Sequence, residues 1–247
     1  MNPTLETIMN HRSIRKFTDE KLTEEEIHTI VKAAQMASTS SYVMAFTIIG
    51  VTDKEKKAQL RAVSGQPYVE DNAHLFVFCA DLKRIHDQSS KDETVLTSLQ
   101  STEAFIVATV DASLAAQNAV VAAESMGLGI CFLGSLRNDI RRTSEILNIP
   151  EYVIPLYGIA VGYPDHKPEQ KPRFPIPVVY HENGYAQDER EQKQLLTEFD
   201  ERIKDYYDSR SENQRLDTWT NQMDRKYSKL TRMDVTQYVQ GQKLNIK

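Results

Sequence analysis

The chain has 247 residues, of which 40% are hydrophobic and 26% charged, and its formal net charge is −5 at neutral pH. This composition is typical of an ordinary soluble globular protein and excludes a fibrous or intrinsically disordered chain. The acidic balance also argues against a broad nucleic-acid or anionic-membrane surface. Any basic cluster is therefore expected to be a local binding site.

The first 36 residues predict two helices with clear start signals. Asn2 is a helix cap and Pro3 a first helical residue, and apolar residues at helical spacing follow them. Thr23 and Glu26 have the spacing of a capping box, which opens a second helix ending near Met36.

From residue 38 to residue 162 the pattern alternates between short apolar runs and helical periods. β-branched and apolar runs bounded by polar residues are typical of strands. The expected elements are a hydroxyl-rich turn at 38–41, a strand at 44–51, a solvated helix at 53–63, a central strand at 74–81, a flexible loop at 85–93, a helix at 103–126, a strand at 130–135, a helix at 137–149 and a strand at 152–162.

The longest apolar run, residues 104–130, predicts a buried helix and not a membrane span, because polar residues interrupt it. These are Asp111, Gln117, Asn118 and Glu124. The first residues lack the apolar segment of a signal peptide. The two cysteines, Cys79 and Cys131, lie in apolar runs and are expected to be buried thiols. We therefore expect a cytoplasmic protein that does not bind nucleic acid or membranes.

Composition changes near residue 162, because five of the nine prolines lie between residues 162 and 185. This stretch is expected to be extended and stiff. Amphipathic helices rich in charge are predicted at 188–210 and 218–230, with narrow apolar faces. We therefore expect a core at 1–185 and, within the same domain, a helical C-terminal excursion at 186–247.

A basic cluster lies close to the amino terminus. Arg12, Arg15 and Lys16 lie within five residues, with His11 and Ser13 beside them. Such a cluster can be a solvated patch, an ion-pair network or an anion site. A phosphate monoester carries about −1.5 to −2 charges and is well matched by guanidinium groups with a hydroxyl.

Two weaker features point to ligand binding. Lys171 and Arg173 flank a proline that keeps their backbone extended, although a solvated basic turn has the same pattern. Glycines at 127, 129 and 134 permit close approach of a flat ligand or simply form turns. They do not form a dinucleotide-binding fingerprint, because the required order of strand, glycine turn and helix is absent.

The chain lacks the H-E-x-x-H, C-x-x-C, P-loop and G-x-S-x-G motifs. No acid–base pair stands out either, and the histidines are scattered. Anion-binding groups without a nucleophile or base suit a protein in which a bound cofactor performs the chemistry.

Several segments, in unbroken order along almost the whole chain, resemble the nitroreductase superfamily. The resemblance is greatest to its NADPH-dependent branch of FMN reductases and oxygen-insensitive nitroreductases. The segments are HRSIRKFTDE, STSSYV, SGQPYVEDNA, FVFCAD, AAQNAVVAAESMGLGICFLGSLRN, LYGIAVGYP, KPRFP and VYHENGY. The pairing of HRSIR with KPR at this separation is specific.

The resemblance implies a set of ligand-binding residues. The FMN phosphate and ribityl chain would be held by His11, Arg12, Ser13 and Arg15. The hydroxyl turn with Thr39 and Ser40 would reach the flavin from the other subunit, and Gln66 would bind the region between ribityl and ring. The remaining FMN contacts would be Phe132, Leu133, Gly134, Ser135, Lys171 and Arg173. Arg215 would meet the 2′-phosphate of NADPH.

Two residues depart from the family pattern. Ser135 stands where many members have a second glycine, and Phe132 stands where a tyrosine is common. Both departures bear on substrate preference more than on flavin binding.

The resemblance also implies an α+β fold, with a central antiparallel or mixed sheet flanked by helices, in an intertwined homodimer. The helix that is apolar all round would then form the subunit interface. The expected activity is two-electron, ping-pong reduction of free flavin, nitroaromatics or quinones by NADPH, with FMN as prosthetic group and no catalytic side chain. The alternatives are a dedicated FMN reductase that supplies a partner monooxygenase, a flavin-binding module without turnover, and a helical interaction protein.

Overall fold

The computed structural model describes residues 1–89, 92–185, 188–210 and 214–247. Its described residues form two compact units, Met1–Pro168 with Arg232–Lys247, and Glu169–Thr231. The predicted division between residues 185 and 186 falls at residues 186–187, outside the described residues, and stays a prediction.

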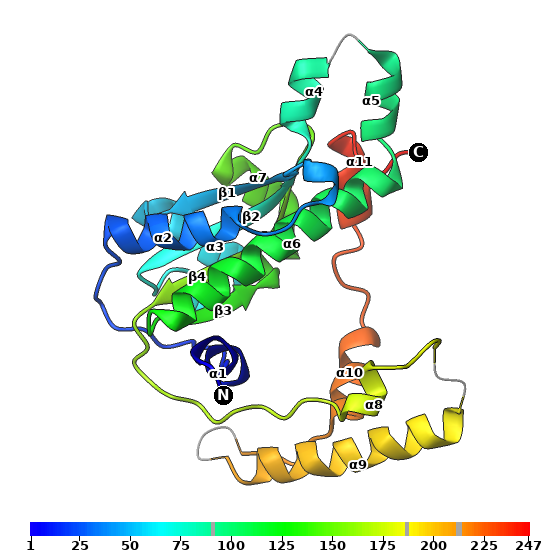
Figure 1. The fold of residues 1–247 in the computed structure, drawn as a ribbon. Helices are drawn as coiled ribbons and strands as arrows, with labels where there is room; N and C mark the ends of the chain where they lie inside the picture. The colour runs from blue at the N-terminus through cyan, green and yellow to red at the C-terminus, as the bar shows by residue number, and fades with distance from the viewer. Residues whose placement is uncertain (90–91, 186–187, 211–213) are drawn as a thin grey trace. The chain divides into compact units, whose positions relative to one another are not determined.

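The first unit is built on a sheet whose strands, among the described residues, number four in the order β1-β2-β4-β3 (Figure 1). Every pair of neighbouring strands is antiparallel. The strands are β1 (Phe46–Val51), β2 (His74–Asp81), β3 (Gly129–Leu133) and β4 (Val153–Gly162). The four predicted strands are therefore confirmed, with β2 in the interior of the sheet.

Helices cover both faces of this sheet (Figure 1). In the described part of the first unit they are α1 (Pro3–Met9), α2 (Glu24–Gln35), α3 (Lys54–Ser64), α4 (Lys83–Ser89), α5 (Glu93–Leu99), α6 (Thr102–Ser125), α7 (Ile140–Leu147) and α11 (Val235–Gly241), with short 3-10 turns η1 (Ser40–Tyr42), η2 (Pro67–Val69) and η3 (Gly134–Asp139). The unit is thus α+β, as predicted.

Side chains of β2 alternate between the two faces of the sheet, so they belong to two different parts of the core. Phe76 and Phe78 pack with residues of α2 and α6 on one face. Leu75, Val77 and Cys79 pack with Leu60, Ile146 and Leu147, which come from α3 and α7, on the other. Because both faces are covered, all eight residues of β2 are buried. Burial on both faces explains why this strand is an almost continuous apolar run in the sequence.

Helix α6 is the central helix of the first unit and packs on α2 and β2. Its buried side consists mostly of alanines, which allow close approach. Among the described residues it is the one helix long and apolar enough to cross a membrane, a test that core helices of soluble proteins also pass. Its opposite side exposes Ile106, Val110 and Leu114.

The loop predicted at 85–93 is wrong for the described residues of that stretch, which belong to α4 and the start of α5. Two aspartates explain the difference. Asp81 accepts a hydrogen bond from the Lys83 amide at the start of α4, and Asp92 accepts from two amides of α5. The His86 ring also stacks on Tyr152 at 4.1 Å, which anchors α4 to the core. Residues 90–91 lie outside the described residues.

The end of the chain returns to the first unit, which the sequence pattern did not predict. Tyr238, Val239 and Leu244 are buried in a cluster that also holds Ala108 and Ile140. The Gln242 backbone carbonyl accepts a hydrogen bond from the Tyr152 amide at 3.0 Å.

In the second unit, the predicted helices are confirmed as α9 (Glu189–Asp208) and α10 (Trp219–Tyr227), and α8 (Ile176–Val179) adds a single turn. A small cluster of Phe199, Ile203 and Tyr207 forms the core of this unit. Phe174 packs against it, with its ring centroid 4.6 Å from that of Phe199.

Candidate functional site

The segment with the N-terminal basic cluster lies along the outer edge of β3. The Ile14 amide donates to the Ile130 carbonyl at 2.8 Å, and Ser13 forms an isolated parallel bridge with Ile130. A Cβ atom at Gly129 would lie 2.6 Å from the Ile14 side chain. Glycine is therefore required at this position for the segment to dock on the sheet.

Arg15 lies on the side of this segment that faces η2 and β3. Its guanidinium lies close enough to the Tyr68 phenol and the Cys131 thiol to oppose the rise that burial causes in the pKa of both. Burial raises the pKa of the Cys131 thiol, and the charge of Arg15 partly opposes that rise. Arg15 is nevertheless exposed, so its guanidinium can still meet a ligand.

The other predicted flavin residues of this part of the chain are Gln66 and residues 132–135, the latter at the end of β3 and just after it. The Ser135 hydroxyl is hydrogen-bonded to that of Ser64, at the end of α3 and two residues before Gln66. Phe132 exposes 42% of its surface and meets Tyr157 edge to face at 5.5 Å. We call these residues the β3 cluster, namely Ser13, Arg15, Gln66, Phe132, Leu133, Gly134 and Ser135.

The β3 cluster fits FMN by its chemistry. Arg15 and Ser13 are the cation and hydroxyl that a phosphate requires. The exposed ring of Phe132 is an apolar surface for a flat ligand. Leu133 is buried, and its neighbours Gly134 and Ser135 begin the η3 turn.

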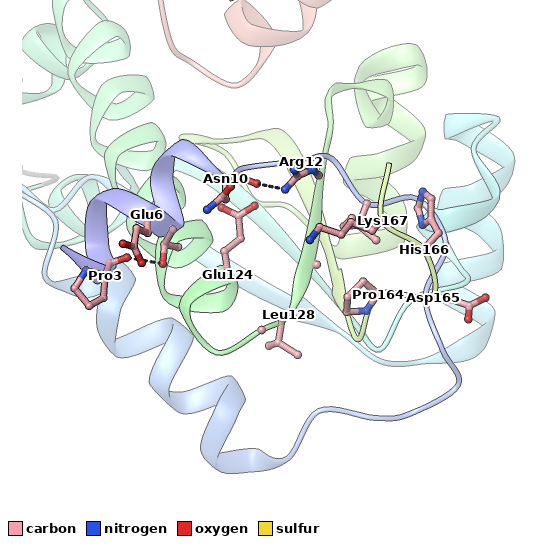
Figure 2. Close-up of a pocket in the computed structure, with 14 residues that line it drawn as sticks. Pro3, Glu6, Asn10, Arg12, Glu124, Leu128, Pro164, Asp165, His166 and Lys167 are labelled. Carbon is pink, nitrogen blue, oxygen red and sulfur yellow. Dashed lines mark hydrogen bonds between the residues drawn. The ribbon is translucent and has the colours of Figure 1, made fainter. Parts of the chain in front are cut away.

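Arg12 points away from the β3 cluster. It lines a separate cavity of about 780 Å³ that also includes Glu6, Glu124, His166 and Lys167 (Figure 2). One Nη of Arg12 donates to the Asn10 carbonyl at 3.0 Å, and its buried Nε lacks a hydrogen-bond partner among the described residues. Because carboxylates also line this cavity, its charge is mixed and less suited to a phosphate.

His11 is held by α6. Its Nδ1 lies 2.7 Å from a carboxylate oxygen of Glu124, in the last turns of that helix. In the sequence, Glu124 is distinguished only as a polar residue that interrupts an apolar helix. The structure shows that this acid fixes the start of the basic segment.

The hydroxyl turn is held by the other half of α6. The buried Asp111 accepts hydrogen bonds from the amides of Ser40 and Ala45, both at 3.0 Å. Ser41, Tyr42 and Met44 have positive φ values of 47°, 60° and 51°. Such conformations cost energy and persist where the surroundings fix them.

Helix α6 therefore separates the hydroxyl turn from the basic segment within one chain. Asp111 and Glu124 are 13 residues apart along the helix. At 1.5 Å per residue, their Cα atoms are about 20 Å apart. The hydroxyl turn thus lies near the middle of α6, and His11 lies near its C-terminal end.

Two of the three predicted ligand residues of the second unit lie around Tyr207. The Lys171 Nζ lies 5.6 Å from the centre of its ring, and the Arg215 guanidinium carbon lies 4.1 Å from it. An Nη of Arg173 donates to the Lys171 carbonyl at 2.7 Å. Lys171 and Arg215 thus share Tyr207 as a neighbour, whereas Arg173 bonds to the backbone of its own segment.

Two functional candidates escaped sequence analysis. Asp111 holds the hydroxyl turn, and its only signal was an acid inside an apolar helix. Asp217 is a buried acid that pairs with Arg215, and it follows Arg215 by two residues. No sequence pattern distinguishes it from a solvated aspartate.

Comparison with known proteins agrees with this architecture. The model of the nitroreductase family matches residues 8–163, and that of the C-terminal domain of the same family matches residues 171–247. The chain belongs to the nitroreductase family. The predicted resemblance is thereby confirmed.

Relatives of this nitroreductase-family chain cover nearly its full length. The chain is 52% identical over 226 residues to an FMN reductase (NADPH) of Bacillus subtilis, a match that covers 90% of each chain. It is similar in structure to the NfrA1 nitroreductase of Bacillus subtilis, with a TM-score of 0.95 and 48% identity over 99% of this chain and 100% of the other. An NADPH:FMN oxidoreductase of Vibrio harveyi, solved in complex with NAD+, gives a TM-score of 0.88 and 36% identity over 100% of both chains.

Proposed function

We propose that this protein is an NADPH-dependent FMN reductase and nitroreductase, with FMN as its prosthetic group and small-molecule electron acceptors. The observation that carries this proposal is the 52% identity to an FMN reductase (NADPH) over 90% of the chain. Bound FMN supplies the chemistry, which is two-electron transfer from NADPH to an acceptor such as free flavin, a nitroaromatic or a quinone.

Protein residues hold the cofactor and shape its surroundings. Ser13 and Arg15 bind the phosphate end, because they share a side of the basic segment, and His11 completes this group. Phe132 offers an apolar surface, and the backbone of residues 133–135 supplies polar groups beside it. Gln66 follows Ser64, whose hydroxyl is hydrogen-bonded to that of Ser135, by two residues, and its proposed role is to bind the middle of the cofactor.

Arg12, Lys171 and Arg173 complete the predicted set of FMN ligands. The side chain of Arg12 lines the separate cavity, so we propose that it contributes through its backbone. Lys171 and Arg173 belong to the second unit, and their contact with FMN stays a prediction.

In the proposed reaction, no protein side chain acts as a nucleophile. The cysteines are free and buried, and burial raises the pKa of the Cys79 thiol to about 12. A thiol with such a pKa is inert near neutrality. Free thiols also suit the cytoplasm, which is the location that we propose.

A homodimer is part of the proposal. In one chain, Thr39 and Ser40 lie about 20 Å along α6 from the basic segment. A second copy can bring its own hydroxyl turn to the cluster of the first. The apolar residues that α6 exposes, Ile106, Val110 and Leu114, supply a surface for that contact.

The first experiment is a visible spectrum of the purified protein before and after anaerobic addition of NADPH. A flavin spectrum that NADPH bleaches is the expected result. Bound flavin that NADPH leaves oxidised would favour a binding module without turnover. Protein that is colourless and takes up no added FMN would contradict the proposal.

Arg15→Ala tests the phosphate anchor. Loss of one charge-assisted hydrogen bond should weaken FMN binding by roughly 1.5–3 kcal/mol, which is about 10- to 150-fold in Kd. Flavin fluorescence during titration of the apoprotein measures this change. The matched control is Lys16→Ala, which removes a neighbouring cation that is not assigned to FMN. An equal Kd for FMN in Arg15→Ala and in wild type would show that Arg15 does not bind the cofactor.

The acceptor is identified by comparison of kcat/KM values for free FMN and for a nitroaromatic. A strong preference for free FMN would favour a dedicated FMN reductase that supplies reduced flavin to another enzyme. Comparable values would favour a broad reductase.

A further inference from the structure

Asp217 is a buried carboxylate between two arginines of the second unit. It exposes 5% of its surface, whereas both arginine side chains are about half exposed. Its Oδ2 lies 3.1 Å from the Nε of Arg215. An Nη of Arg225 donates to both carboxylate oxygens, at 3.0 and 2.7 Å. One acid thus links two cations that are ten residues apart.

Arg215 is fixed by further contacts on its other sides. Its backbone amide donates to the Tyr207 carbonyl at 3.2 Å, and its guanidinium carbon lies 4.1 Å from the centre of the Tyr207 ring. Tyr207 is itself buried, and its hydroxyl donates to Gln222 at 3.1 Å. The guanidinium therefore has little freedom, although nearly half of its side chain is open to solvent.

Charge explains what such an arrangement can do. A single carboxylate cannot neutralise two guanidinium groups, so a positive charge remains on Arg215 and Arg225. Asp217 engages the Nε edge of Arg215, and within the described ranges one Nη of Arg215 donates to Gln222 at 3.5 Å. A cation held in place before its ligand arrives loses less side-chain entropy on binding. A phosphate with about two negative charges suits such a pair.

We propose that Asp217 is the positioning residue for recognition of the 2′-phosphate of NADPH. It holds Arg215 and Arg225 next to each other as one receptor for a phosphate group. This inference rests on the proposed function, because it assumes that Arg215 meets the nucleotide. Asp217 itself does not touch the phosphate. Because the same carboxylate holds Arg225, this arginine is the second residue that binds the 2′-phosphate.

The test is Asp217→Asn in the FMN-loaded enzyme. Two physical effects have opposite signs here. If Asp217 only dilutes the positive charge, its neutralisation should tighten phosphate binding. If it positions the arginines, binding should weaken, because an amide cannot hold two guanidinium groups. We expect KM for NADPH to rise about tenfold, with kcat, flavin content and KM for NADH within twofold of wild type.

A direct binding measurement accompanies the kinetics. Adenosine 2′,5′-bisphosphate and adenosine 5′-monophosphate are titrated calorimetrically. Asp217→Asn should weaken the first about tenfold and leave the second unchanged. Asp217→Glu, which restores the charge, should recover part of the lost affinity. The matched control is Glu201→Gln, which removes an exposed acid of the same unit and should change neither titration.

Reference variants separate the possible failures. Arg215→Ala should raise KM for NADPH and not for NADH. If KM for NADPH equals KM for NADH in both wild type and Arg215→Ala, the preference for NADPH in the proposed function is wrong. If Arg215→Ala discriminates but Asp217→Asn behaves like wild type or binds more tightly, only the positioning role is overturned. Equal losses for NADPH and NADH in Asp217→Asn would also overturn it, since they indicate a structural role.

Discussion

Lys57 and His74 are polar side chains buried in the first unit, close to the start of β2. The Lys57 Nζ donates to the Asn72 carbonyl at 2.8 Å, whereas the buried His74 Nε2 lacks a partner among the described residues. Burial and the charge of Lys57 lower the pKa of His74 to about 4. Burial also lowers the pKa of Lys57 to about 8. The site therefore favours a neutral imidazole.

This histidine predicts acid sensitivity. The folded-state pKa of His74, about 4, lies below its ordinary value of 6.5, so the unfolded chain binds more protons between these values. Stability should therefore fall as the pH drops from about 6.5 to about 4, with about 3 kcal/mol lost to this residue. Urea unfolding at several pH values measures the loss. In His74→Leu, which lacks the titrating group, the loss of unfolding free energy between pH 6.5 and 4 should be smaller by about 3 kcal/mol, so the slope is shallower. An unchanged slope would contradict the assignment.

At the scale of elements, α6 joins parts of the chain that are far apart in sequence. Asp111 binds the turn before β1, and Glu124 binds His11. Both acids lie on a helix whose buried residues, apart from Asp111, are alanine or valine. The helix thereby sets the distance, within one chain, between two segments that the proposed dimer assigns to different flavin sites.

Asp111→Ala should disorder the hydroxyl turn. Two amide groups, of Ser40 and Ala45, would lose their acceptor, at a cost of about 2–4 kcal/mol. Thermal unfolding should show a lower Tm, and hydrogen exchange should rise at residues 39–45. Glu103→Gln is the control, because it changes an exposed acid in the first turn of the same helix. Unchanged exchange at the turn in Asp111→Ala would show that the turn is held by other contacts.

Helix-capping residues and the spacing of apolar residues account for the helices and strands that could be predicted. The capping box of Thr23 and Glu26 is present at α2, and the apolar run at 74–81 is the buried strand β2. The loop predicted at 85–93 was wrong because α4 has few apolar residues and depends on Asp81 and on stacking against Tyr152. Those partners come from a strand end and from a segment 66 residues farther along the chain.

At the scale of the whole molecule, exposed apolar residues favour association. Ile106, Val110 and Leu114 lie at four-residue spacing on one side of α6 and are 50%, 47% and 44% exposed. On α1, Leu5, Ile8 and Met9 are exposed as well. A stable monomer rarely presents so many large apolar side chains on neighbouring helices.

The dimer is tested by Val110→Glu together with Leu114→Glu. Burial of two unpaired carboxylates in an interface should raise the dimer Kd by roughly two orders of magnitude or more. The variant should still fold, because both positions are exposed in the single chain. Sedimentation velocity measures the assembly, and flavin content is expected to fall with it. Leu230→Glu, an exposed apolar residue of the second unit, is the control. A variant that remains dimeric would place the interface elsewhere.

Local signals in the sequence determined most helices and strands, the family and the kind of ligand. Capping, proline positions and apolar periodicity depend on neighbours a few residues away, so they can be read without the fold. The HRSIR and KPR segments carry the family signature in the same way.

Only the tertiary structure decided which side chains of those segments meet. It placed Arg15 in the β3 cluster and Arg12 in a separate cavity, although both lie in the same five-residue motif. It also brought the chain end onto the first unit and placed Asp217 between two arginines. The direction of a side chain and the pairing of a buried charge depend on residues distant in sequence. Those residues come together only when the chain has folded.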